Sequence, residues 1–113
     1  MNIAEAIKCL REQVKNQPKG LPEDLFHYIS SVTPIINVEL LIKNENGNSL
    51  LSWRDDPYAG KGWHIPGGVI RFKETIKERI DEVARTEIGT FIDSYNQEPV
   101  AINEIFDHER EVR

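Results

Sequence analysis

The sequence predicts a mixed α/β fold in one domain, preceded by a helical extension. Its 113 residues fit a single domain of modest size. Apolar residues recur at helical spacing in the first part of the chain, and they alternate with a period of two in the segment that follows. The content of 39% apolar and 29% charged residues is typical of a folded globular protein rather than a disordered one.

Charge and cysteine content exclude several classes of protein. The net charge of −5, with no basic run to offset it, argues against a general nucleic-acid binder. The single cysteine, Cys9, can form no intrachain disulfide, which fits a reducing cytoplasm. The N-terminus is broken by charges every few residues, unlike a signal peptide, and no apolar run approaches membrane length. We therefore expect a cytoplasmic protein without a nucleic-acid or membrane partner.

Residues 1–32 are predicted to form the helical extension. Apolar residues at helical spacing predict a first helix over residues 3–16: Ile3, Ile7, Leu10 and Val14. A second short helix is predicted from Leu25, Ile29 and Val32, with Pro22 in its first turn. The apolar stripe of the first helix is expected to pack against the domain, with a dimer interface as the alternative.

Residues 34–54 are predicted to form a β-hairpin. Alternating apolar residues give its first strand one core-facing side: Ile36, Val38, Leu40 and Ile42. Asn46-Gly47 has the preferred chemistry for a tight turn with positive φ. On the return strand, Trp53 shares a face with Leu51, and Arg54 lies on the opposite face.

A loop over residues 55–62, a short strand over 63–65 and a turn at 66–68 are predicted to follow. A last strand is predicted from the alternation of Val100, Ile102, Glu104 and Phe106. The polar ending, residues 107–113, leaves this sheet with few strands and an unprotected edge. Either the chain is truncated at its C-terminus, or a partner such as a second copy in a homodimer completes the sheet.

A charged helix is predicted between Thr75, which forms a capping box with Glu78, and Gly89, which can adopt the left-handed conformation. Glu87 follows Ile80 by seven residues, which places it about 20° away around an α-helix. It therefore points to the apolar side marked by Ile76, Ile80 and Val83, in the last turn, where the helix dipole disfavours an anion. The remaining charged residues are predicted to be solvated: Glu74, Glu78, Asp81, Glu82 and Arg85.

A cation must offset the charge of Glu87, since burying an unpaired carboxylate costs on the order of several kcal/mol. An arginine partner, escape to solvent and a divalent metal are the alternatives. The Gly67-Gly68 pair favours the metal, because it offers backbone carbonyls that no Cβ covers. A hard cation such as Mg²⁺ takes a few oxygen ligands and keeps several waters, and a loop carbonyl with one or two helix carboxylates is such a set.

The segment GWHIPGGVIRFKETIKERIDEVARTEIG, residues 62–89, resembles a Nudix box. That box reads Gly, five residues, Glu, seven residues, Arg-Glu-aliphatic-x-Glu-Glu-x-Gly-aliphatic. Four positions of residues 68–89 match at the right spacing: Gly68, Glu74, Glu87 and Gly89. Three depart from it, since Glu82 replaces the arginine, Val83 the next Glu, and Thr86 the first of the paired Glu residues.

The GDP-mannose mannosyl hydrolases are the Nudix branch most similar in pattern. Of the acids in the Arg-Glu-aliphatic-x-Glu-Glu part of the box, they too keep only the last, and they too have an aliphatic residue at the position of Val83. The similarity covers residues 33–106, from Thr33-Pro34 and the strand of Glu39, through LLSWR, to Trp63 and PGG. The resemblance implies an α/β/α sandwich with a mixed sheet for residues 33–113, incomplete at the C-terminus.

The resemblance also implies a Mg²⁺ site, with Mn²⁺ as a substitute. Its ligands would be the Gly67 carbonyl and Glu87, with Glu74 as a further candidate. With Glu82 in place of the box arginine, Glu74 is expected to lack its usual partner.

Three substrate-binding residues follow from the same resemblance. Glu39 matches a sugar or base contact, and Arg54 matches a diphosphate contact, which suits a bidentate guanidinium. Arg71 can reach the space of the family arginine that directly follows Gly-Gly. The residues alone are also consistent with Glu39 as an exposed strand acid, and with an ion pair between Arg54 and Asp55 or Asp56.

The predicted function is Mg²⁺-dependent hydrolysis of a nucleoside-diphosphate sugar such as GDP-mannose. The alternative is a non-catalytic domain that binds a nucleotide or a protein partner, since several box acids are absent. The family's general base is a histidine in a late loop, and it has no match here, because His108 does not align with it. His27 and His64 are expected to be structural.

Overall fold

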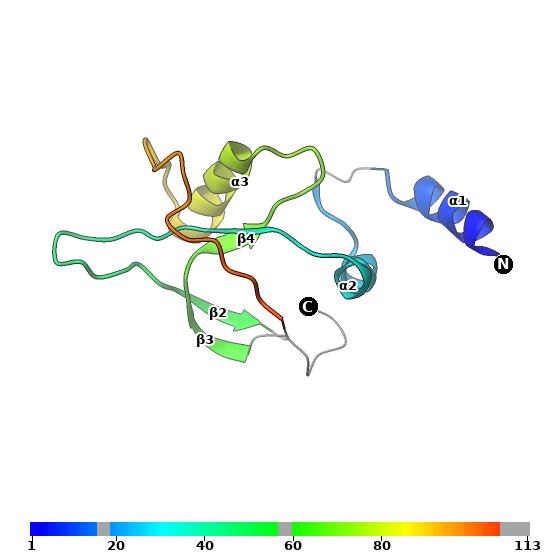
Figure 1. The fold of residues 1–113 in the computed structure, drawn as a ribbon, viewed down its shortest axis with the longest axis horizontal. Coiled ribbons are helices and arrows are strands. Elements are labelled where there is room, and N and C mark those ends of the chain that lie inside the picture. Colours follow the sequence, from blue (N-terminus) through cyan, green and yellow to red (C-terminus); the bar gives the residue numbers. More distant parts are fainter. Residues whose placement is uncertain (16–18, 57–59, 107–113) are drawn as a thin grey trace. The chain divides into compact units, whose positions relative to one another are not determined.

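A computed structural model describes residues 1–15, 19–56 and 60–106. Helices and small antiparallel sheets occur together in it (Figure 1), which confirms the predicted mixed α/β class. The chain divides into two compact units. The N-terminal unit contains residues 1–35, 71–73 and 104–106, and the sheet unit contains residues 36–70 and 74–103. The division into domains at residue 33 and the layered sandwich stay predictions.

In the N-terminal unit, both predicted helices form. Helix α1 (Ile3–Gln13) begins at Asn2, whose side chain accepts a 2.8 Å hydrogen bond from the Glu5 N–H. The helix was predicted to reach residue 16, which lies outside the described residues. It ends earlier, because Val14 is already extended. Helix α2 (Glu23–Val32) follows Pro22, its N-cap.

The apolar stripe of α1 is exposed. Helix α1 has no buried residue, and Ile3, Ile7 and Leu10 are 80%, 43% and 43% exposed. Periodicity identified the helix correctly, but it does not determine what covers its apolar side. What covers this stripe, the domain or a second copy of the chain, stays a prediction.

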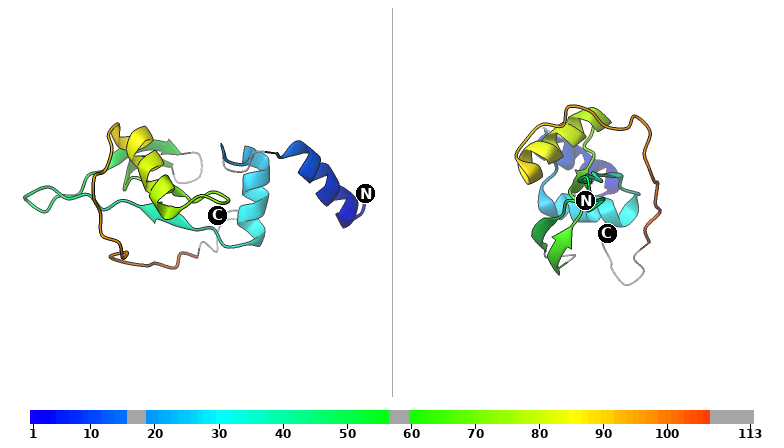
Figure 2. Two further views of the ribbon diagram at one scale, coloured as in Figure 1. Left: turned by 90° about the horizontal axis from the view of Figure 1, so that it is seen from above. Right: turned by 90° about the vertical axis from the view of Figure 1, so that its left-hand side faces the viewer.

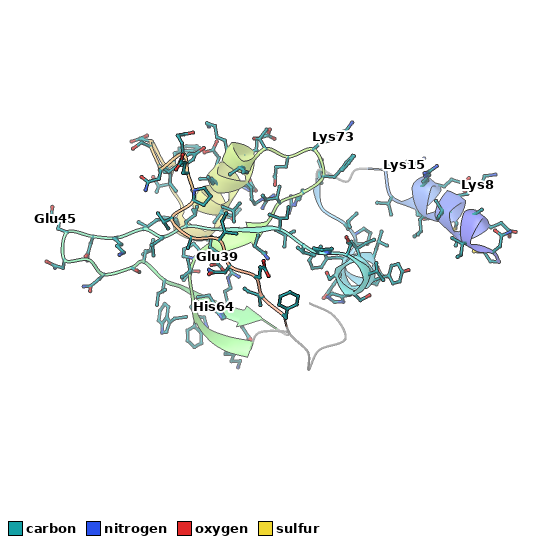
Figure 3. All side chains as sticks on the ribbon, in the orientation of Figure 1. Lys8, Lys15, Glu39, Glu45, His64 and Lys73 are labelled. Carbon is teal, nitrogen blue, oxygen red and sulfur yellow. The ribbon has the colours of Figure 1, made fainter. Side chains whose placement is uncertain are left out.

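The sheet unit contains two separate strand pairs rather than one long hairpin. Strand β1 (Asn37–Glu39) pairs with β4 (Gly67–Val69), and β2 (Ser52–Asp56) pairs with β3 (Gly60–His64), both antiparallel. The predicted hairpin survives only near its tip, labelled by Glu45 in Figure 3, where Lys43 and Ser49 form an isolated bridge. There the Gly47 N–H donates to the Asn44 carbonyl at 3.0 Å, with φ of 80° at Gly47 as predicted.

Two further expectations for the sheet are wrong. Residues 66–68 do not form a turn, because Gly67 and Gly68 are extended and pair with β1. Residues 100–106 form no strand, and their large apolar side chains are exposed: Val100, Ile102, Ile105 and Phe106. Alternation alone does not make a strand, since the ladder also needs a neighbouring edge with which to pair.

Helix α3 (Ile76–Val83) lies against the β1–β4 pair (Figure 2). Ile80 and Val83 pack with Leu40 in the core, whereas Ile76 is 59% exposed, contrary to the predicted face. The helix continues as a π-helical turn, η2 (Ala84–Ile88), in which the Ala84 carbonyl accepts from the Gly89 N–H at 2.8 Å. Gly89 ends it with φ of 81°, as predicted, but the wider turn was not predicted.

The start of α3 is confirmed at Thr75, whose Oγ1 accepts a 3.0 Å hydrogen bond from the Glu78 N–H. Thr75→Ala is therefore expected to lower the free energy of unfolding by about 1 kcal/mol, because one helix N–H loses its acceptor. Urea denaturation followed by circular dichroism measures this change. An unchanged midpoint would mean that the cap contributes nothing to this helix.

Candidate functional site

Three residues that are distant in the sequence meet in the sheet unit, and we call them the Arg54 cluster: Arg54, Gly67 and Glu87. Arg54 Nη2 donates to the Gly67 carbonyl at 2.9 Å and to Glu87 Oε1 at 2.5 Å. The other carboxylate oxygen, Glu87 Oε2, accepts from the Gly67 N–H at 2.8 Å. The resemblance implies that Gly67 and Glu87 bind a metal and that Arg54 binds a diphosphate, and the structure brings these three residues together.

Gly67 can bind side chains through its backbone because of its place in the β1–β4 ladder. The even-numbered residues on either side of Gly67 form the hydrogen bonds to the β1 segment. The Pro66 carbonyl accepts from the Leu40 N–H, and the Ile70 N–H donates to the Ile36 carbonyl. Ladder hydrogen bonds in an antiparallel pair involve alternate residues. The N–H and carbonyl of Gly67 therefore point away from β1, toward Arg54 and Glu87.

The alternation of β2 directs Arg54 to the same place. Trp53 points to the opposite face, where its ring meets that of Trp63 edge-on with centroids 5.4 Å apart. Arg54 itself lies opposite Gly62 on β3, which carries no side chain to obstruct it. Its side chain is 31% exposed, so the guanidinium reaches the cluster while keeping access to solvent.

Glu87 reaches the cluster from the π-helical turn, and its side chain is 22% exposed. Of the three alternatives for offsetting its charge, the structure contains the arginine partner. The same geometry also describes a cation site, because the Gly67 carbonyl and Glu87 Oε1 converge on a single cationic nitrogen. π-Helical turns are frequent at functional sites, which agrees with this position.

Glu39 lies beside the Arg54 cluster, on β1 opposite Gly67 (Figure 3). A Cβ atom added to Gly67 would lie 3.0 Å from Glu39 Cγ and 2.6 Å from the Val38 carbonyl oxygen. Only glycine fits this approach of the two strands. Glu39 is exposed, so it can contact a ligand bound at the cluster as well as solvent.

Glu74 does not belong to the Arg54 cluster, and the expectation that it is solvated is wrong. Its usual partner is absent, since Glu82 holds that position, but Arg79 takes its place and donates to both of its oxygens at 2.7 Å, with the side chains of Glu74 and Arg79 only 11% and 7% exposed. These hydrogen bonds raise the pKa of Arg79 above its ordinary value. Since the pair already engages both oxygens of Glu74, the structure does not favour this residue as a metal ligand.

Arg79 is the important residue that the sequence analysis missed. Its side chain packs against Gly68, where an added Cβ would lie 3.4 Å from Arg79 Cδ and 3.3 Å from Val83 Cγ2. The available signal was its place four residues before Val83, which puts an arginine beside the apolar stripe of the helix. An arginine at such a position needs a nearby acid to offset its charge, just as Glu87 needs a cation.

The other predicted site residues lie elsewhere. Arg71 belongs to the N-terminal unit, where its Nε lies 3.4 Å from the position of a Cβ added to Gly20, and its role at the substrate stays a prediction. His64 is on β3, and its buried Nε2 has no hydrogen-bond partner among the described residues. His108 lies outside the described residues. Within the described part of the chain, no three His, Cys, Asp or Glu side chains form a metal-binding group.

Comparison with known proteins finds a relative that matches part of the chain. No family model matches the chain. The low-salt glycan biosynthesis protein Agl8 of Haloferax volcanii is 32% identical over 79 residues, which are 70% of this chain and 50% of that protein. The chain thus spans about half the length of this relative. In the described residues, every helix is too short or too polar to cross a membrane.

Proposed function

We propose that this chain carries a Mg²⁺-dependent site for a nucleoside-diphosphate sugar, as in a Nudix hydrolase of the GDP-mannose mannosyl hydrolase type. The observation that carries the proposal is the convergence of the Gly67 carbonyl and Glu87 Oε1 on one cationic nitrogen. The name of the Haloferax relative places it in glycan biosynthesis, which uses activated sugars and agrees with this substrate class. The single cysteine fits a cytoplasmic location.

The donor set suits Mg²⁺ held partly by substrate. One carboxylate and one carbonyl leave several coordination positions for water and phosphate oxygens, which is the usual way that proteins hold this ion; Mn²⁺ fits the same set. When bound, the ion supplies positive charge that stabilises the leaving diphosphate. A protein site of this kind binds the free metal weakly and the metal with its phosphate ligand more tightly.

The residues around the cluster have separate roles in this proposal. Glu87 and the Gly67 carbonyl hold the metal, while the Gly67 N–H fixes the orientation of the Glu87 carboxylate. Arg54 contacts the diphosphate and stabilises charge that develops on it. Glu39, exposed beside Gly67, contacts the sugar or the base.

Removal of the charge of Glu87 tests the metal site directly. In the parent protein with a saturating nucleoside diphosphate, Mg²⁺ at ten times its dissociation constant should add about 1.4 kcal/mol to the free energy of unfolding. This is a rise of roughly 5 °C in melting temperature for a domain of this size. Glu87→Gln should abolish the rise, because the amide is a poor ligand for a hard cation. Thermal unfolding with and without Mg²⁺ measures the difference.

The matched control is Glu78→Gln, which removes the same charge from an exposed position on α3. This variant should keep the full response to Mg²⁺. A Glu87→Gln protein that responds to Mg²⁺ like the parent would exclude Glu87 as a ligand. The structural role of Glu87 would then be its ion pair with Arg54 alone.

A non-catalytic binding domain is the second candidate, and two ion pairs favour it. Glu74 is held by Arg79, and Glu82, at the position of the box arginine, pairs with Arg85 on the surface. Neither carboxylate is therefore directed to the Arg54 cluster. Calorimetric binding of GDP with Mg²⁺, in the absence of any hydrolysis of GDP-mannose by the same preparation, would support the binding domain over the enzyme.

A further inference from the structure

We infer that Arg54 is the resident cation of the metal site, and that it leaves the site when a divalent ion binds. The freed guanidinium is then available to the diphosphate of the substrate. The site would thus exchange one cation for another, so that metal binding switches Arg54 from an internal partner to a substrate ligand. The exchange rests on the metal site of the proposed function, and the transfer of Arg54 to the diphosphate rests on its substrate class as well.

The exchange follows because Arg54 already occupies the two oxygens that would bind the metal. Arg54 Nη2 contacts the Gly67 carbonyl and Glu87 Oε1, and these are the only two protein ligands proposed for the metal within the described residues. A guanidinium nitrogen and a divalent ion cannot share these oxygens, because their positive charges would lie within about 3 Å of each other and repel strongly. Metal binding therefore requires Arg54 to move.

The cluster keeps its shape when Arg54 moves. Glu87 Oε2 accepts from the Gly67 N–H at 2.8 Å, a contact that does not involve Arg54. This hydrogen bond holds Oε1 close to the Gly67 carbonyl after the guanidinium has left. The ligand pair is thus preorganised, and the displacement of one side chain is the main cost of metal binding.

There is also room for Arg54 to move. Gly62 lies opposite Arg54 on β3, and among the described residues a Cβ atom added there would meet only His64 Nε2, at 3.9 Å. Gly62 thus presents no side chain to Arg54, whose own side chain is 31% exposed and can move toward solvent.

The inference makes metal and diphosphate bind cooperatively. Without a diphosphate, a metal ion must displace Arg54 from its ion pair with Glu87, and Arg54 gains no new anionic partner. With a diphosphate present, Arg54 gains a new anionic partner when it leaves Glu87. Coupling between two ligands is reciprocal, so each should increase the affinity for the other.

Titration with Mn²⁺ alone, followed by electron paramagnetic resonance of the free ion, tests the exchange. Arg54→Gln removes the resident cation and should bind Mn²⁺ at least about tenfold more tightly than the parent, because the competing charge is gone. Arg85→Gln is the matched control, since it removes the same charge from an exposed pair with Glu82 and should bind as the parent does. Arg54→Met provides a second variant, and a melting curve confirms that each protein is folded.

Mn²⁺ affinity that is unchanged or weaker in both folded Arg54 variants would overturn the exchange. Titration with GDP at saturating Mn²⁺ tests the second half separately, and Arg54→Gln should bind GDP at least about tenfold more weakly than the parent. Equal affinity for GDP in the two proteins would overturn the transfer of Arg54 to the diphosphate. Absence of GDP binding to the parent would overturn the proposed substrate class, while tighter Mn²⁺ binding by Arg54→Gln would still support the exchange.

Discussion

Arg79→Gln is expected to lower the free energy of unfolding of the sheet unit by about 3–5 kcal/mol. The side chains of Arg79 and Glu74 are 7% and 11% exposed and are joined by two hydrogen bonds of 2.7 Å. The substitution leaves the Glu74 carboxylate in a poorly solvated place without its cation. Because the pKa of Arg79 is raised, the charge of the arginine contributes fully at neutral pH, and this contribution is lost as the pH rises through the raised pKa.

Equilibrium unfolding in urea measures this loss, and Arg85→Gln provides the control. Arg85 makes a similar pair with Glu82, but their side chains are 61% and 37% exposed. Removing an exposed pair changes stability by less than about 1 kcal/mol. The double variant Glu74→Leu with Arg79→Met should recover much of the loss, because it leaves no unpaired buried charge. Equal small effects of Arg79→Gln and Arg85→Gln would show that the Glu74–Arg79 pair does not stabilise the fold.

Gly67→Ala is expected to cost about 3 kcal/mol of stability and to disrupt the Arg54 cluster. The new methyl group would lie 2.6 Å from the Val38 carbonyl oxygen, which is backbone and cannot rotate away. The β1–β4 pair must separate to admit it, and the Gly67 carbonyl then moves relative to Glu87. The variant should therefore also lose the stabilisation by Mg²⁺.

The control for Gly67→Ala is Gly62→Ala, another substitution within an antiparallel strand. Among the described residues, a Cβ at Gly62 would meet only His64 Nε2 at 3.9 Å, an ordinary contact. Stability should change by less than about 0.5 kcal/mol, as at an unobstructed site. Thermal or urea unfolding of the two variants compares them directly. A Gly67→Ala protein as stable as Gly62→Ala would mean that β1 and β4 do not approach each other this closely.

The local features of the fold could be predicted from the sequence because they depend on residues close together in the chain. Thr75 and Gly89 set the ends of the charged helical segment, and the Asn46-Gly47 pair forms the hairpin tip. Each of these signals acts over a few residues. Helical spacing likewise identified α1 and α2, although it gave no information on what packs against α1.

The non-local features could not be derived in the same way. The pairing of β1 with β4, rather than with β2, depends on the close approach at Gly67, and nothing in the alternation of residues 36–42 shows it. The Arg54 cluster was predicted only through the resemblance to the Nudix pattern. Its central feature, the arginine on both proposed metal ligands, required the structure, because residue types do not reveal which of two cations occupies a site.

The edge-on tryptophan pair on β2–β3 determines what fluorescence can report about this protein. The chain has two tryptophans, Trp53 and Trp63, and they are 57% and 65% exposed on the same hairpin. Its intrinsic tryptophan emission therefore comes entirely from residues adjacent in sequence to Arg54 or on the strand beside it. Tryptophan emission therefore reports the unfolding of the β2–β3 hairpin, whereas circular dichroism at helical wavelengths is dominated by α1, α2 and α3. The two signals together distinguish unfolding of the hairpin from loss of the helices without any added label.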